Sequence, residues 1–574
     1  MPAPHRARAL SNRHMVAAGN YHAALVGMNI LEAGGNAVDA GVAAGIVLGV
    51  TNCDQVNFGG VAPIMIRMAE TGKVMTISGL GWWPKAADIN YFIDECGGKM
   101  PPGVRRTVMP AAPDAWIKAL QLYGTMTFGE VVEGAKRLAG EGYPATTLNA
   151  ELMEANKDAY AKWPANKAVF LPGGKPSVAG QNFVQSDLAA TMQYMVDEEK
   201  AAKGGREAGL QAARDAFYKG DIAAKIADYN KENGGWVTRE DLAEYESGHE
   251  EPYAVDFMDF TVYGCGPWCQ GPIILETLNI LSGVDLKSMG HNTPEYLHNL
   301  TEALNLAYAD RHTYQGDPRF IDVPMDQILD KDYGATRRSL IDPEKAFGEM
   351  PPAGTPEELG IAARASVPAG DKAEGYKEMA VDTAYACAVD KDGNVFSATP
   401  SDGQHSSPMI PGLGFVPSNR GTQSWTDPEN PACMAPGKRP RLTPNPAIAL
   451  KEGKWVMPFG SPGNDVQPQA MLQVLLNHHL WGMRPLEAVE APRVASTNFP
   501  RSSEPHDYFA GRLNAESRIE SDVCDALSAK GHDVKMWPDW EWRAGAVSMI
   551  KSDLETGIME GAADPRRPGL ALGG

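Results

Sequence analysis

A threonine near residue 380 has the most distinctive chemistry in this sequence. Thr383 follows Asp382 and precedes a run that alternates small and apolar residues as a strand does. If the bond between these two residues breaks, the threonine gains an α-amine, with an ordinary pKa of about 7.7 to 8.0, that can accept the proton of its own hydroxyl. One residue then supplies nucleophile and base. An ordinary strand start remains the alternative, because threonine after aspartate is common.

The same hydroxyl could also cut the chain. Its oxygen would attack the carbonyl of Asp382 and form an ester, and water would then release two chains. The hypothesis is a precursor with a cleavage site at Asp382 and Thr383. It predicts a large fragment, residues 1–382, and a small fragment, residues 383–574.

The elements around Thr383 are readable from their periodicity. Small and apolar residues at helical spacing predict two helices over 21–50, joined at the glycines before Asn36. Residues 113–314 are mostly helical in pattern, for example 187–203 and 294–311, with a strand-like run at 257–265. A Pro- and Gly-rich stretch, from about 350 to 380, predicts a flexible linker. Hairpins around 390–394 and 446–458 and a helix over 467–480 follow it.

Composition excludes several classes of protein. The chain has 574 residues, 43% hydrophobic and 22% charged, as soluble globular proteins have. Its net charge of -20 disfavours nucleic acid and anionic membranes as partners. Seven cysteines do not indicate a disulfide framework. The N-terminus lacks a signal-like apolar region, so we expect a cytoplasmic protein, or a periplasmic one if a leader was removed.

Short motifs in a fixed order give the sequence a family resemblance. They are LeuGluAlaGlyGlyAsnAlaValAspAla from Leu31, AlaTyrAlaAspArg from Ala307, GlyAspPro from Gly316, ValAspLysAspGlyAsn from Val389, ProGlyLysArgPro from Pro436, GlySerProGly from Gly460, GluAlaProArg from Glu490 and AlaAspProArgArg from Ala563. In these the chain resembles the gamma-glutamyltranspeptidase family of N-terminal nucleophile hydrolases. The resemblance implies an α+β fold, the four-layer αββα sandwich, and autocatalytic cleavage into two associated subunits.

Family roles can be assigned to matching positions. Thr383 resembles the nucleophile, and Ser401 stands where the family has a second hydroxyl that bonds to it. Gly463 and Asn464 match the two residues whose backbone N–H groups form the oxyanion hole, which stabilises the charge that develops on the carbonyl oxygen. The family usually has a second glycine where this chain has Asn464. The role therefore requires that asparagine accept a glycine-like conformation, which asparagine often does.

The departures from the family concern the substrate. Gamma-glutamyl enzymes hold the α-carboxylate of the donor with an arginine and paired serines, and this chain has Trp82 and Trp83 at the first place and only Thr443 at the second. They hold the α-amine with an aspartate, for which the run 418–425 offers no carboxylate. Cationic and aromatic residues replace these groups, and the expected substrate-binding residues are Arg420, Arg441, Thr443, Trp82 and His405, with Arg105 and Arg106 as further candidates.

These replacements suit an acyl group that lacks an α-amine and is apolar or carries a carboxylate, because an unpaired ion in a dry pocket is unfavourable. We therefore expect an amide hydrolase like the cephalosporin acylase or oxamate amidohydrolase branches. The alternatives are a gamma-glutamyltransferase or glutathione hydrolase, and an inert homologue that acts as a binding protein.

No cofactor or metal is predicted. The cysteines Cys265 and Cys269 lack a second pair at ligand spacing and indicate a Gly- and Pro-rich loop. His478 and His479 lie in an apolar helical stretch and indicate a partly buried or surface pair rather than metal ligands. The expected partners are a small amide and the two subunits of one precursor, and a homo-oligomer is possible.

Overall fold

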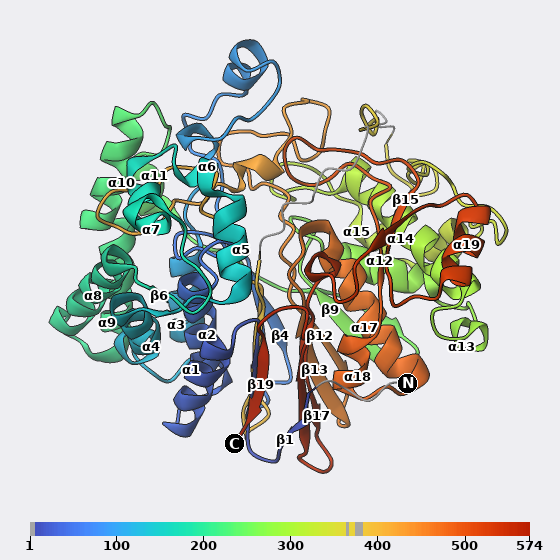
Figure 1. Cartoon of the computed structure of the whole chain (residues 1–574), viewed down its shortest axis with the longest axis horizontal. Coiled ribbons are helices and arrows are strands. Elements are labelled where there is room, and N and C mark those ends of the chain that lie inside the picture. The colour runs from blue at the N-terminus through green and yellow to red at the C-terminus, as the bar shows by residue number, and fades with distance from the viewer. Residues whose placement is uncertain (1–5, 363–366, 374–382) are drawn as a thin grey trace.

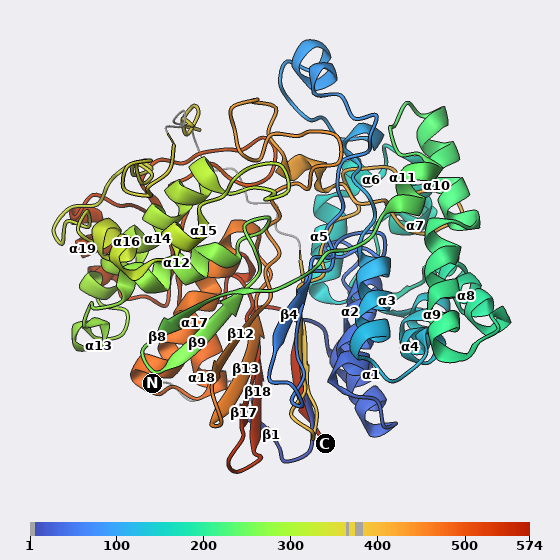
Figure 2. The ribbon, with the colours of Figure 1, turned by 180° about the vertical axis from the view of Figure 1, so that it is seen from behind.

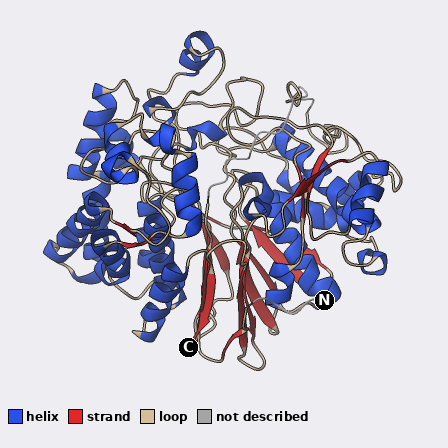
Figure 3. Ribbon diagram, in the orientation of Figure 1, coloured by secondary structure: helices blue, strands red, loops and turns tan. Residues whose placement is uncertain are grey.

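The computed structural model describes residues 6–362, 367–373 and 383–574, and two facing β-sheets lie at its centre between layers of helices (Figure 1). Coloured by secondary structure, the strands form a central group with helices on both sides (Figure 3). Within the described residues each sheet has seven strands, and every neighbouring pair in it is antiparallel.

The two sheets, sheet A and sheet B, each combine strands from several parts of the chain. In spatial order, sheet A contains β1 (Ala9–Ser11), β18 (Met559–Ala563), β17 (Ser548–Asp553), β13 (Trp455–Gly460), β12 (Ala447–Lys451), β9 (Phe260–Gly264) and β8 (Tyr253–Phe257). Sheet B contains β19 (Leu570–Gly573), β2 (Met15–Ala18), β10 (Ala386–Val389), β11 (Val395–Ala398), β3 (Ile64–Arg67), β4 (Val74–Ile77) and β7 (His249–Glu250). Both sheets therefore mix strands from distant parts of the chain.

The period of two along each strand separates two apolar layers. On β2 and β10, Val16 and Ala386 face the cluster formed with the helices, whereas Met15 and Cys387 belong to the cluster shared with sheet A. The same shared cluster contains Ile448 of β12. Both faces of sheet B are thus buried, as a sandwich of two sheets requires.

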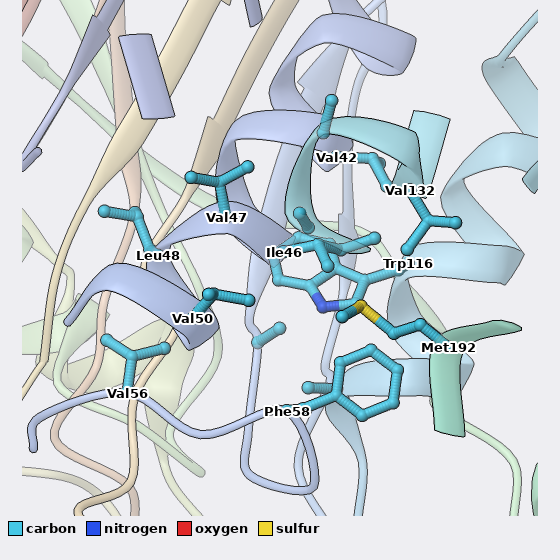
Figure 4. Close-up of a cluster of buried hydrophobic side chains, with 14 of the residues drawn as sticks. Val42, Ile46, Val47, Leu48, Val50, Val56, Phe58, Trp116, Val132 and Met192 are labelled. Atoms are coloured by element: carbon cyan, nitrogen blue, oxygen red, sulfur yellow. The ribbon is translucent and has the colours of Figure 1, made fainter. Parts of the chain in front are cut away.

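Helices over sheet B form one outer layer. They include α1 (Tyr21–Glu32), α2 (Ala37–Thr51), α3 (Ala112–Tyr123), α4 (Phe128–Glu141), α8 (Ser186–Ala201) and α9 (Gly205–Tyr218). Every residue of α2 is buried, and its apolar side chains pack around Trp116 of α3 (Figure 4). At Gly41 an added Cβ would lie 2.0 Å from the ring of Phe396 on β11, so glycine permits this close helix–sheet contact.

Other helices cover the outer face of sheet A. They are chiefly α12 (Gly271–Leu281), α14 (Pro294–Tyr314), α17 (Gln467–Trp481) and α18 (Pro485–Glu490). A small third sheet of β14 (Val494–Ser496), β15 (Arg512–Glu516) and β16 (Asp533–Trp537) lies with α19 (Ser521–Ala529) beside α14. The view from behind shows α12 and α17 against sheet A and α1 to α4 on the far side of sheet B (Figure 2).

Shorter elements complete the two helical layers. On the sheet B side they are α5 (Thr147–Ala155), α6 (Lys157–Tyr160), α7 (Pro164–Phe170), α10 (Asp221–Glu232), α11 (Arg239–Glu244) and the pair β5 (Tyr143–Pro144) and β6 (Asn182–Phe183). On the sheet A side they are α13 (Leu286–Met289), α15 (Met325–Ile328) and α16 (Lys331–Arg338).

The expected α+β fold, an αββα sandwich, is confirmed by these layers. The paired helices α1 and α2, the helices α8, α14 and α17, and the hairpins β10–β11 and β12–β13 are also confirmed.

The flexible linker expected from about 350 to 380 stays a prediction, but its first part makes contacts with the rest of the chain. Leu359 is buried with Tyr333, and the N–H of Gly354 donates to the carboxylate of Asp310 at 2.7 Å, so tertiary contacts hold these residues despite their turn-rich composition. Residues 363–366 and 374–382 lie outside the described residues.

Candidate active site

Thr383 lies just before β10, an interior strand of sheet B, and its side chain is buried. Its peptide N–H donates to the carbonyl of Gln55 at 3.0 Å, and its carbonyl accepts from Nη1 of Arg567 at 3.0 Å. The φ angle of Thr383 is 97°. A β-branched residue rarely adopts this conformation, because its Cβ crowds the backbone, and such strain costs roughly 1–3 kcal/mol. The surrounding hydrogen bonds therefore hold Thr383 in a strained position.

Ser401 brings a second hydroxyl to Thr383. It follows β11, and its N–H donates to the carbonyl of Val61 at 3.0 Å, which fixes the backbone. The Oγ of Ser401 lies 2.6 Å from Oγ1 of Thr383, and both side chains are fully buried. The two hydroxyls form a short hydrogen bond in a site from which water is largely excluded.

Arg420 places a positive charge next to this hydroxyl pair. It begins a short 3₁₀ turn over 420–423, and its Nη2 donates to Oγ of Ser401. Its Nε lies 3.9 Å from the carboxylate of Asp402. That carboxylate also accepts from the hydroxyl of Ser418 at 2.6 Å. The charge of Arg420 is therefore balanced by Asp402 while its guanidinium contacts Ser401.

The loop after β13 passes close to the start of β10. At Gly460 an added Cβ would lie 2.2 Å from the ring of Tyr385, so a larger residue would push the two segments apart. Further along the loop, Gly463 has a φ of 126° and Asn464 a φ of 50°. Asn464 thus adopts the left-handed conformation that its expected oxyanion role requires. Its Oδ1 accepts from the hydroxyl of Thr443 at 3.3 Å.

A buried ion pair anchors this loop. The carboxylate of Asp465 accepts from Nη1 of Arg311 at 2.5 Å, from the hydroxyl of Ser502 at 2.6 Å and from Nε2 of Gln270 at 2.5 Å. Burial raises the pKa of Asp465, but the charge of Arg311 and the bonds from Ser502 outweigh it and leave the pKa below its ordinary value. The carboxylate of Asp465 is therefore ionised. Its hydrogen bonds hold the loop in place at the adjacent Asn464.

Two residues at Thr383 were missed by sequence reasoning. Gln467, the first residue of α17, has its Nε2 3.5 Å from Oγ1 of Thr383. Arg567 contacts the carbonyl of Thr383 as described above. Each stands in or beside a family motif, but only the folded chain brings them to the threonine. Gln467 lies shortly after GlySerProGly, and Arg567 is the last residue of AlaAspProArgArg. These positions were the available signal.

The expected substrate-binding arginines occupy different environments. Arg441 is buried, and its Nη1 donates to the carbonyls of Arg311 at 2.7 Å and Gln315 at 3.2 Å, at the end of α14. Burial, aided by the charge of Arg311, lowers its pKa well below the ordinary value. Arg106 donates to the carbonyl of Ser406, and Arg105 stacks over Tyr91 at 3.8 Å. Of the expected arginines, Arg420 has the described contact nearest to Thr383.

The expected aromatic residues pack chiefly among other aromatic side chains. Trp83 is buried, and its indole N–H donates to the hydroxyl of Ser424 at 2.9 Å. Trp82 is half-buried, with its ring 4.8 Å from that of Tyr245. His405 meets the ring of Tyr160 edge-on, with 6.4 Å between centroids. Their contact with a substrate stays a prediction.

Among residues 6–362, 367–373 and 383–574, no group of three or more His, Cys, Asp or Glu side chains is placed to hold a metal ion. Cys265 and Cys269 are buried free thiols. In the same part of the chain, no helix has the length and apolar character needed to span a bilayer.

The chain is similar to known proteins over nearly its full length. The sequence profile of the family described as Gamma-glutamyltranspeptidase matches residues 23–574. The chain is 32% identical to the Acylase ACY 1 proenzyme of Pseudomonas sp. (strain SE83), over 98% of this chain and 94% of that protein. It is 30% identical to the Glutathione hydrolase-like YwrD proenzyme of Bacillus subtilis (strain 168), over 98% and 99%. The crystal structure of cephalosporin acylase from Bacillus halodurans superposes with a TM-score of 0.85 and 27% identity, over 100% and 98% of the two chains.

Proposed function

Because this chain belongs to the gamma-glutamyltranspeptidase family, we propose that it is a self-cleaving amide hydrolase with Thr383 as its nucleophile. The observation that carries the proposal is the buried pair of hydroxyls, Thr383 Oγ1 and Ser401 Oγ, 2.6 Å apart at the start of a central strand. Two relatives are proenzymes by name, which supports cleavage of this chain into fragments 1–382 and 383–574.

Cleavage proceeds through the hydroxyl of Thr383. Its oxygen bonds to the carbonyl carbon of Asp382, the carbon–nitrogen bond between the two residues breaks, and the hydroxyl proton moves to the nitrogen of Thr383. Water then hydrolyses the ester and regenerates the hydroxyl. The strain at Thr383 favours this step, because cleavage frees its φ angle.

Turnover uses the same oxygen on an amide substrate. The new α-amine accepts the hydroxyl proton and gives it to the leaving amine, and water releases the acyl group from Thr383. The backbone N–H groups of Gly463 and Asn464 stabilise the oxyanion. An amine in place of water would make the enzyme a transferase.

We propose an acyl group without an α-ammonium. A substrate ammonium placed beside residues 418–425 would meet the like charge of the Arg420 guanidinium. The carboxylate of Asp402 could not balance it, because it is already engaged by Arg420, Ser418 and Asn419. The side chain of Gln423, in the same run, is occupied by Thr443 at 2.9 Å. The acylase names of two similar proteins support this choice. The glutathione hydrolase name of another relative supports a gamma-glutamyl donor as the second candidate.

Two measurements test the proposal. Denaturing electrophoresis with N-terminal sequencing should give a small fragment that begins Thr-Ala-Tyr-Ala, and the Thr383→Ala protein should remain one chain. A panel of gamma-glutamyl, glutaryl, oxamyl and aliphatic amides, read by mass spectrometry, then assigns the acyl group. Hydrolysis of the gamma-glutamyl amide at a rate equal to the best of the others would favour the second candidate.

A further inference from the structure

We infer that Gln467 is a catalytic residue of this site: its side-chain amide donates a hydrogen bond to Oγ1 of Thr383 and stabilises the negative charge that this oxygen acquires as it attacks. The inference rests on the proposed function, because it takes Thr383 as the nucleophile. It adds a donor on the nucleophile itself, distinct from the donors on the substrate carbonyl.

The chemistry of the neighbours fixes the orientation of this amide. Nε2 of Gln467 lies 3.5 Å from Oγ1 of Thr383, and Oε1 lies 3.2 Å from the backbone nitrogen of Asn445. A backbone N–H can only donate, so the amide oxygen must face Asn445 and the amide NH₂ must face Thr383. Gln467 is fully buried, which prevents water from replacing either contact.

The position of Gln467 adds to the effect of its N–H group. It is the first residue of α17, a 15-residue helix whose N-terminal end carries a partial positive charge. Gly463 directly precedes, and Asn464 begins, the short 3₁₀ turn that leads into this helix. One anchored segment therefore holds both the expected oxyanion donors and the amide on the nucleophile.

Each hydroxyl of the pair accepts a hydrogen bond from another side chain. Arg420, which has no acceptor, donates to Ser401, and Gln467 donates to Thr383. With its oxygen accepting from Arg420, Ser401 can direct its own hydrogen at Thr383. The oxygen of Thr383 then accepts two hydrogen bonds, which favour its ionised form.

Self-cleavage of the full-length precursor is the readout, because it needs no knowledge of the substrate. Precursor from cell-free synthesis is followed by denaturing electrophoresis across a range of pH. Gln467→Leu removes the donor and should slow cleavage about 10- to 100-fold at every pH, the range for loss of a hydrogen bond to a charged group. Gln467→Met, which keeps the side-chain length, should show the same slowing and replaces the leucine variant if that protein does not fold.

Gln467→Glu separates a catalytic from a structural role. Its carboxylate repels the developing charge at neutral pH, whereas its protonated form can donate as the amide does. The variant should therefore recover relative to wild type as the pH is lowered. Wild-type rates and pH profiles in the Gln467 variants would overturn the inference.

Gln473→Glu is the matched control. Gln473 is buried on the same helix, and its amide bonds to the backbone of Val494 at 2.9 and 3.0 Å. This variant should keep the shape of the wild-type pH profile, and the same recovery at low pH would assign the effect to folding and overturn the inference. Failure of the wild-type precursor to cleave, or cleavage of Thr383→Ala, would instead overturn the proposed function.

Discussion

Ser401 is the hydroxyl in shortest contact with Thr383, so its removal tests the pair directly. In Ser401→Ala the oxygen of Thr383 loses a partner at 2.6 Å, and the guanidinium of Arg420 loses its contact with this hydroxyl. We expect self-cleavage and amide hydrolysis to slow about 10- to 100-fold, as for loss of a charge-assisted hydrogen bond. Rates of precursor cleavage measured by electrophoresis check this.

Ser397→Ala is a suitable control for that variant. Ser397 is buried on β11, four residues before Ser401, but its hydroxyl bonds to that of Tyr385 at 2.7 Å, within the layer between the sheets. We expect a loss of stability near 1 kcal/mol, from about 0.5–1.5 kcal/mol per hydrogen bond, with cleavage unchanged. Equal slowing in both variants would show that the hydroxyls of Ser397 and Ser401 act only through the fold.

Asn464 presents a separate test, because its φ of 50° favours glycine and asparagine over other residues. Asn464→Gly should keep the loop and cleave within a few-fold of wild type. Asn464→Val should lose roughly 1–2 kcal/mol of stability, because a β-branched side chain crowds the backbone in the left-handed conformation that asparagine tolerates, and should cleave more slowly because the loop shifts. Urea unfolding and cleavage rates measure both. A valine variant as active as the glycine variant would argue against the oxyanion role.

At the scale of elements, local patterns predicted local structure. The helical spacing in α1, α2 and α17 and the turn at Gly393 depend on neighbouring residues, so the sequence alone was sufficient there. The strand β19 was not predicted, because its partner β2 lies at the other end of the chain. Likewise, the polar run from 350 to 362 contacts Asp310 and Tyr333, which no local pattern connects to it.

The same distinction applies to the site. Thr383, Ser401 and the pair Gly463 and Asn464 could be proposed from motifs. The contacts of Gln467 and Arg567 with Thr383 depend on how β10 meets the loop after β13 and the chain end. Such contacts follow from sheet topology, which residue spacing does not encode.

The helix α17 contains a histidine that tests acid stability. His479 stacks on Phe260, with 4.2 Å between ring centroids, and its Nε2 has no hydrogen-bond partner among the described residues. Burial, with the charges of His478 and Lys551, lowers its pKa to about 2. The folded state therefore keeps His479 neutral while the unfolded state, with a pKa of about 6.5, takes up a proton. The stability that the buried, neutral His479 contributes is therefore present above pH 6.5 and is lost as the pH falls below that value.

His479→Phe removes this pH dependence and keeps the aromatic contact. The variant should match or slightly exceed wild type at pH 8. At pH 5 the variant's advantage over wild type in free energy of unfolding should grow by about 2 kcal/mol. This follows from about 1.36 kcal/mol per pH unit between pH 6.5 and 5. Urea unfolding at both pH values measures it, and the pH 8 pair serves as the control for packing. A constant difference between the two pH values would show that His479 is not held neutral.

At the scale of the whole molecule, the proposed fragments are interwoven in both sheets. Residues 1–382 contribute β1, β8 and β9 to sheet A and β2, β3, β4 and β7 to sheet B, while residues 383–574 contribute the rest. Five neighbouring pairs join the two fragments: β1 with β18, β9 with β12, β2 with β10, β2 with β19, and β3 with β11. Separation would leave the backbone groups of these strands unpaired and expose the apolar layer between the sheets.

The cleaved protein should therefore dissociate only as it unfolds. In native size-exclusion chromatography both fragments should co-elute, and in increasing urea their separation should coincide with the loss of the circular dichroism signal of the sheets. Because unfolding of the cleaved form releases two chains, its midpoint should rise with protein concentration, whereas that of the uncleaved Thr383→Ala precursor should not. Fragments that separate in buffer while each keeps its secondary structure would contradict this, since neither could then depend on strands supplied by the other.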